Sequence, residues 1–161
     1  MNVFDNIQGK AHVVAESSRL KATTAGHIYD LKMAADTDNG TIVCVGNHIE
    51  GQVFAAKDYA AGEKPYLILT APFAYNGKKA WSDEKYFYNA KDEIARAYEL
   101  NVDDIFTVSA DAFVGTPAVG KFVDAAYTVA DAAGENGFVG EIIEEVNYTN
   151  GVSYRVLVRA I

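Results

Sequence analysis

Residues 138–160 carry the pattern that most restricts the fold of this chain. The stretches FVGEIIEEVNY and VSYRVLVRAI flank the turn sequence Thr149-Asn150-Gly151. Side chains that alternate between apolar and polar, on both sides of an Asn-Gly turn, predict an antiparallel β-hairpin. One face of the second strand is expected to carry Val152, Tyr154, Val156 and Val158. On the opposite face, acids of the first strand (Glu141, Glu144, Glu145) are expected to meet Arg155 and Arg159.

Short apolar runs bounded by glycine, proline or acidic residues recur before this hairpin. They predict further strands within residues 27–34, 41–46, 64–72, 103–113 and 118–133. The segment 82–100 gives a mixed signal, for which we expect strand and turn with a short helix near residues 92–97. The sum is about seven to nine strands and at most one or two short helices. We therefore predict a mainly β fold, either a small β-barrel or a sandwich.

The first part of the chain lacks such a pattern. AESSRLKATTAGH, at residues 15–27, is polar and has no convincing period. We interpret residues 1–26 as an extended N-terminal arm that orders on a partner, and residues 27–161 as a single mainly β domain.

Composition excludes several classes of function. The net charge is −8 and no run of Lys or Arg exceeds Lys78-Lys79, so we expect neither nucleic-acid binding nor attachment to an anionic membrane. The N-terminus does not resemble a signal peptide, and no apolar run is long enough for a membrane-spanning helix. The single cysteine, Cys44, cannot form an intramolecular disulfide and is expected to be a small buried hydrophobe.

The stretch DTDNG at residues 36–40 could be a calcium loop or a turn. An EF-hand loop that starts at Asp36 would need a ligand where Gly40 stands, glycine where Thr41 stands and Glu where Asn47 stands. Asp38-Asn39-Gly40 supplies residues that tolerate a tight turn. We therefore predict a hairpin turn that leads into the buried strand 41–46, and no metal or cofactor.

No arrangement typical of an enzyme is present in the sequence. The histidines are His12, His27 and His48, and none belongs to a zinc or nucleophile motif. Adjacent carboxylates such as Asp103-Asp104 point to opposite faces of a strand, so they do not form a catalytic pair. We expect no enzymatic activity.

Aromatic residues crowd residues 75–98. They are typical either of a β-domain core or of an interface, where Tyr and Trp dominate binding. The candidate interface combines these aromatic side chains with the apolar residues of the arm: Val3, Phe4, Ile7, Tyr75, Trp81, Tyr86 and Tyr88.

Residues 28–123 resemble the head decoration (cement, auxiliary capsid) proteins of tailed bacteriophages. The resemblance lies in an acid and an aromatic pair before Asn (Asp83, Phe87, Tyr88, Asn89), in Ala-Arg-Ala-Tyr-x-Leu at residues 95–100, and in the acid-led strand 104–109. DTDNGTIV is also similar to the first hairpin of these proteins. The chain departs from the family pattern near Lys91-Asp92, where that pattern has glycine.

The resemblance implies a structural virion protein on the capsid exterior, assembled in the host cytoplasm. Such proteins bind the major capsid protein, often as trimers at three-fold or quasi-three-fold sites, and reinforce the shell. Their N-terminal arm commonly adds a strand to the capsid. The alternative is a carbohydrate- or receptor-binding β module that uses the Tyr- and Trp-rich segment.

Overall fold

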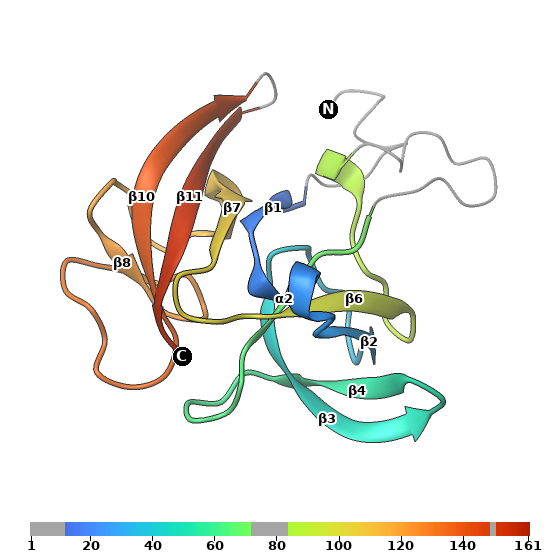
Figure 1. The fold of residues 1–161 in the computed structure, drawn as a ribbon. Helices are drawn as coiled ribbons and strands as arrows, with labels where there is room; N and C mark the ends of the chain where they lie inside the picture. The colour runs from blue at the N-terminus through green and yellow to red at the C-terminus, as the bar shows by residue number, and fades with distance from the viewer. Residues whose placement is uncertain (1–11, 72–83, 149–150) are drawn as a thin grey trace, which may run out of the picture.

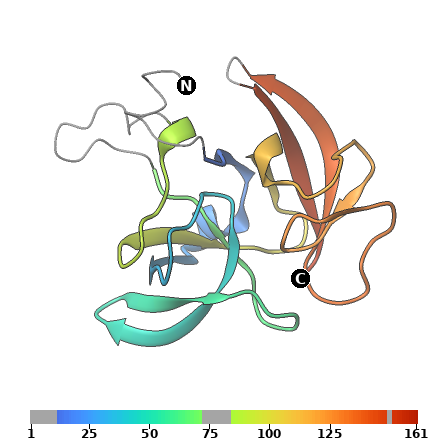
Figure 2. The same cartoon turned by 180° about the vertical axis from the view of Figure 1, so that it is seen from behind.

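The computed structural model describes residues 12–71, 84–148 and 151–161 and is mainly β. Its strands form a closed barrel and a six-stranded sheet, which lie side by side in both views of the chain (Figure 1, Figure 2). The predicted mainly β fold is thereby confirmed, and of the two predicted alternatives, barrel or sandwich, the barrel is present.

The barrel is made of the strands that come first after residue 26. Its order is β2-β4-β3-β5-β6, with bounds Ile28–Lys32, Val53–Asp58, Ile42–Glu50, Tyr66–Ile68 and Ile94–Glu99, respectively. β2 pairs with β4 in parallel and with β6 antiparallel, and the second pairing closes the barrel. The interior is filled by Leu31, Met33, Val43, Tyr66, Ile68, Ala95 and Ala97. Small Ala side chains on β6 leave room for the larger residues of the other strands in this narrow barrel.

The six-stranded sheet uses both ends of the described chain. Its order is β1-β7-β11-β10-β8-β9, with bounds Ala15–Arg19, Ile105–Ser109, Gly151–Ala160, Val139–Tyr148, Phe122–Val123 and Val129–Ala130. The predicted C-terminal hairpin is confirmed as β10 and β11. Arg155 pairs with Glu144 and Arg159 pairs with Glu141 across it. Strict alternation would place these two acids on opposite faces, and a bulge between Ile142 and Glu144 brings both to the arginines. Glu145, which was also expected to meet an arginine, lies opposite Tyr154.

One apolar core joins the sheet to the barrel. Phe106, Ile142 and Val156 of the sheet belong to the same buried cluster as Ile42 and Leu67 of the barrel. Burial of this shared surface stabilises the barrel and the sheet together.

Helices are short in the described residues. They are α2 (Lys21–Ala25) and the 3-10 turns η2 (Glu84–Tyr86) and η3 (Ala110–Ala112). No helix in this part of the chain is long and apolar enough to span a membrane.

The prediction of a short helix near residues 92–97 is wrong, because residues 94–99 form strand β6. Ala95 and Ala97 alternate into the barrel interior, and this tertiary burial outweighs their helix propensity. The turn before the strand places Asp92 at φ 67°, a backbone region that favours glycine.

Two further predictions about strands are corrected. The alternation over residues 118–133 is not one strand: a turn at Tyr127, with φ 59°, separates the short strands β8 and β9. The turn at residues 38–40 exists but makes no hairpin, because β2 and β3 are not neighbours in the barrel.

The second half of the expected N-terminal arm belongs to the folded body. Residues 15–19 form β1 and pair with β7, while Leu20 and Ala22 are buried. The sequence did not indicate this strand because its side chains are mostly polar. Four of its five residues are exposed, as is typical of a strand with one face in water. Residues 1–11 of the predicted arm lie outside the described residues.

Candidate functional site: the anchor of the N-terminal segment

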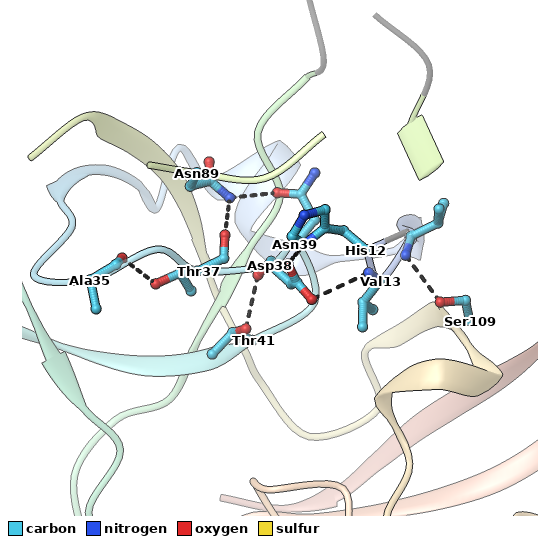
Figure 3. Close-up of polar contacts among 10 residues, drawn as sticks. His12, Val13, Ala35, Thr37, Asp38, Asn39, Thr41, Asn89 and Ser109 are labelled. Carbon is cyan, nitrogen blue, oxygen red and sulfur yellow. Dashed lines mark hydrogen bonds and ion pairs between the residues drawn. The ribbon is translucent and has the colours of Figure 1, made fainter. Parts of the chain in front are cut away.

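Residues 35–41, which we call the anchor loop, connect β2 to β3 and meet the first described residues (Figure 3). Gly40 has φ 89°, and a Cβ atom built on it would lie 2.7 Å from Cγ1 of Val108 and 3.1 Å from Cβ of Ala15. Glycine is required here twice over, since the backbone is left-handed and the sheet packs directly on it. The Thr41 hydroxyl donates to the Asp38 carbonyl at 2.8 Å and closes the turn.

The carboxylate of Asp38 holds the start of the described chain. Oδ1 accepts a hydrogen bond from His12 Nδ1 at 2.6 Å, and Oδ2 accepts one from the Val13 backbone N–H at 3.3 Å. The His12 ring stacks on Tyr88 with 4.8 Å between centroids, and its backbone N–H donates to the Lys85 carbonyl at 2.7 Å. The side chains of His12 and Asp38 are 25% and 32% exposed, so this pair is less screened by water than a surface ion pair.

Val14, the residue after Val13, bonds to the sheet and not to the barrel. The Val14 N–H donates to the Ser109 hydroxyl at 3.0 Å, and the Ser109 N–H donates to the Val14 carbonyl at 2.8 Å. Three consecutive residues, 12–14, are therefore bonded to both parts of the fold. A force applied to the chain ahead of His12 would reach the whole body through these contacts.

Asn39 behaves like a short piece of strand. Its Nδ2 donates to the Thr70 carbonyl at 2.9 Å, and its Oδ1 accepts from the Thr70 N–H at 3.0 Å. The side-chain amide thereby pairs with both backbone groups of Thr70, as a neighbouring strand would. Asn39 is only 8% exposed, so water cannot reach its amide freely. The bonds to Thr70 supply the hydrogen-bond partners that this buried group needs.

Asn89 completes the buried polar network from the far side of the anchor loop. Its Nδ2 donates to Asn39 Oδ1 and to the Thr37 carbonyl, each at 3.1 Å, while the backbones of Asn89 and Thr37 exchange two hydrogen bonds. Asp36 accepts from the Lys91 N–H at 2.9 Å. The side chains of Asp36, Asp38 and Asn39 thus all accept hydrogen bonds from N–H groups of the protein.

These contacts decide how the acidic loop can be interpreted. The oxygens of Asp36, Asp38 and Asn39 are directed at N–H donors of the protein, which is the chemistry of a structural turn. Among the described residues, no group of three or more His, Cys, Asp or Glu side chains is placed to hold a metal ion.

Cys44 is buried, as expected, with 1% of its surface exposed. Burial raises the pKa of its thiol, which disfavours the thiolate that nucleophilic chemistry requires.

The structure brings together only part of the predicted interface. Val3, Phe4, Ile7, Tyr75 and Trp81 lie outside the described residues. Tyr86 and Tyr88 are partly buried in and after η2. Tyr88 packs on His12, so its ring helps to fix the N-terminal segment.

Sequence reasoning missed the partners of the anchor loop. Tyr127, which comes from the turn between β8 and β9, donates a hydrogen bond from its hydroxyl to the Gly40 carbonyl. Its ring is buried, and burial raises the pKa of the hydroxyl far above its usual value. Ser109, Thr70 and Tyr127 are distant from residues 36–40 in the chain, and no local pattern marks them.

Comparisons of this chain with protein-family models, with curated proteins and with solved structures find no match.

Proposed function

We propose that this chain is a structural virion protein that binds the outer surface of a tailed-phage capsid and stabilises the shell. The proposal rests on the resemblance over residues 28–123 and on the way the N-terminal segment is fastened. The carrying observation is the anchor: residues 12–14 are bonded to the barrel by Asp38 and to the sheet by Ser109. A cement protein must transmit load from its attachment segment to its body, and these bonds supply that connection.

In this proposal residues 1–11, with Val3, Phe4 and Ile7, contact the major capsid protein. The protein acts as a homo-oligomer, with a trimer as the expected state, on the capsid exterior after assembly in the host cytoplasm. Many copies side by side would give large avidity from modest single contacts. The turn at Asp92 adds a smaller support, because its positive φ lies where the family pattern has glycine.

The test is a binding assay on purified particles that lack the protein. The full chain is compared with the variant that begins at residue 12 and with Asp38→Ala, which removes the anchor. Both changes are expected to lower the bound copy number. Asp131→Ala is the matched control, because Asp131 is 90% exposed and pairs only with Lys121 among the described residues.

Saturation of the particles by the chain that starts at residue 12 would contradict the attachment mechanism. Mass spectrometry of intact particles supplies the copy number, and absence of the protein from particles would contradict the function itself. The carbohydrate-binding alternative predicts glycan-array binding that Trp81→Ala removes.

A further inference from the structure

In the part of the chain that the structure describes, β1 pairs with β7 along one edge and with no strand along the other. Ala15 lies opposite Val108, and the Ser109 N–H donates to the Val14 carbonyl. In an antiparallel ladder this pattern makes Ala15–Val108 a non-hydrogen-bonded pair, and Ser17–Phe106 is the next such pair. The backbone N–H and C=O groups of Ala15 and Ser17 therefore point away from β7. Among the described residues, no hydrogen bond uses these four groups.

The free edge is short because both of its ends are closed. At one end the Asp38 carboxylate accepts from the Val13 N–H, which is the preceding outward donor. At the other end the register shifts between Ser17 and Arg19, and this bulge ends the regular pairing. The edge thus offers the outward groups of Ala15 and Ser17 alone.

A groove of about 720 Å³ runs along this edge, and we call it the β1 groove. Residues 14–17 in and before β1 line one side of it, and barrel residues such as Asp30, Ile94 and Arg96 line the other. Ala95 points into the barrel, so its neighbours Ile94 and Arg96 on β6 point outward into the groove. Ile94 is 54% exposed, which leaves an apolar contact uncovered beside the unpaired backbone.

The charged residues that line the groove are Glu16, Asp30 and Arg96. Asp30 lies directly opposite Arg96 in the β2–β6 pairing, so Arg96 offsets one acid. The remaining negative charge is that of Glu16, whose carboxylate also accepts a hydrogen bond from the Tyr148 hydroxyl. The whole chain carries −8. An acidic groove favours an occupant with basic side chains, both on encounter and in the bound state.

We propose that the β1 groove is a docking site for an extended, basic segment of a partner polypeptide, which adds as a strand along Ala15–Ser17. The main chain of the segment bonds to the outward groups of Ala15 and Ser17. Alternate side chains then face the barrel side of the groove, with an apolar one over Ile94 and a basic one near Asp30. This proposal does not depend on the capsid assignment, because the residues that line the groove are not those proposed to contact the major capsid protein.

The probe is a synthetic, end-blocked heptapeptide of alternating Val and Lys, added to the full-length protein at low salt. Hydrogen exchange of the Ala15 and Ser17 amides is expected to slow when the peptide binds. An otherwise identical peptide of Val and Glu is expected to bind at least about tenfold more weakly, because its charge has the wrong sign.

Two variants locate the site. Ser17→Pro removes one outward N–H and leaves the β7-facing ladder intact, since proline is tolerated at a free edge. Ile94→Asp removes the apolar contact; its control is Val119→Asp, whose parent side chain is 59% exposed and does not line the groove. Both groove variants are expected to weaken peptide binding about tenfold, and the control is expected to leave it unchanged.

Other outcomes overturn the proposal. Peptide binding without protection of Ala15 and Ser17, or with equal affinity for both peptides, would place the contact elsewhere or remove its specificity. Concentration-dependent dimerisation that Ser17→Pro abolishes would show that a second copy of this chain occupies the edge. A failure of the Val and Lys peptide to bind would mean that β1 is only a short, blunted edge.

Discussion

At the scale of single residues, the anchor loop depends on buried hydrogen bonds made by Asn39 and Gly40. The amide of Asn39 takes the place of a strand beside Thr70, and the Gly40 carbonyl accepts from a tyrosine buried in the sheet. Buried polar groups of this kind cost free energy when one partner is lost, because water cannot replace it.

Gly40→Ala is expected to destabilise the fold by roughly 2–5 kcal/mol, because it adds left-handed strain and a steric clash with Val108. Gly62→Ala separates the two causes. Gly62 has φ 88°, close to the 89° of Gly40, and nothing lies within 4 Å of its added Cβ. It is expected to cost roughly 1–2 kcal/mol. Urea unfolding measures both variants, and equal losses would contradict the close packing at Gly40.

Tyr127→Phe is expected to lower the free energy of unfolding by about 1–3 kcal/mol, since it leaves the Gly40 carbonyl buried without its donor. The control is Tyr148→Phe, which removes an exposed bond to Glu16 and is expected to change stability by less than about 0.5 kcal/mol. Thermal and urea unfolding of the two variants provide the comparison. A neutral Tyr127→Phe would show that the hydroxyl bond does not stabilise the packing of sheet on barrel.

At the scale of elements, Glu99 at the end of β6 ties three segments together. Its carboxylate is 8% exposed and pairs with Lys64 at 3.0 Å, before β5, and with His27 at 3.1 Å, before β2. Burial alone would raise the pKa of this carboxyl, but the bonds and charges of Lys64 and His27 outweigh it and hold the pKa below the ordinary 4.5. The ionised form of Glu99 therefore stabilises the contacts of β6 with the residues before β2 and β5.

Glu99→Gln is expected to destabilise the protein at pH 7, and the deficit is expected to shrink as the pH falls below 4.5. A depressed pKa means that the unfolded chain takes up the proton first, so the stabilisation is present above that pH and is lost as the folded carboxyl protonates. Urea unfolding at pH 7 and pH 3 measures the effect. Glu135→Gln, at an exposed position, is the control. A deficit that stays constant with pH would mean that packing, not charge, is responsible.

Elements defined by contacts within the element or with the next one could be predicted from the sequence. The hairpin of β10 and β11 needs only its own alternation and turn, whereas its two ion pairs also depend on the bulge between Ile142 and Glu144. The parallel pairing of β2 with β4 and the edge pairing of β1 with β7 could not be predicted, because no residue in either strand identifies its partner. β6 was misjudged in part because its Ala residues favour a helix until a barrel surrounds them.

The candidate site shows the same division. Asp38-Asn39-Gly40 indicates a turn from residue types alone, and the turn is present. That Asp38 would bond His12, or Asn39 would bond Thr70, depends on distances across the fold that the alternation pattern does not contain.

At the scale of the whole molecule, the shared core makes the barrel and the sheet stabilise each other. Leu20, which follows β1, belongs to the cluster that joins them. Residues 12–20 of the predicted N-terminal arm are therefore part of the fold.

A chain that begins at residue 12 is expected to unfold in one transition, within about 1 kcal/mol of the full chain. A chain that begins at residue 21 loses β1 and Leu20, exposes the edge of β7, and is expected to be much less stable. Calorimetry on the two truncations tests this boundary. Equal stability of the chains that begin at residue 12 and at residue 21 would contradict the structural role of β1.

The strand order also has a consequence for synthesis. All the barrel strands lie within residues 28–99, so the barrel can close while the rest of the chain is still being made. The sheet cannot follow the same course, because β7 lies between β1, near the start, and β11, at the end. The apolar face that Ile42 and Leu67 turn toward the sheet therefore stays uncovered until β11 has left the ribosome. During that interval the nascent chain is open to aggregation, and chaperones that bind apolar surface would act on it then.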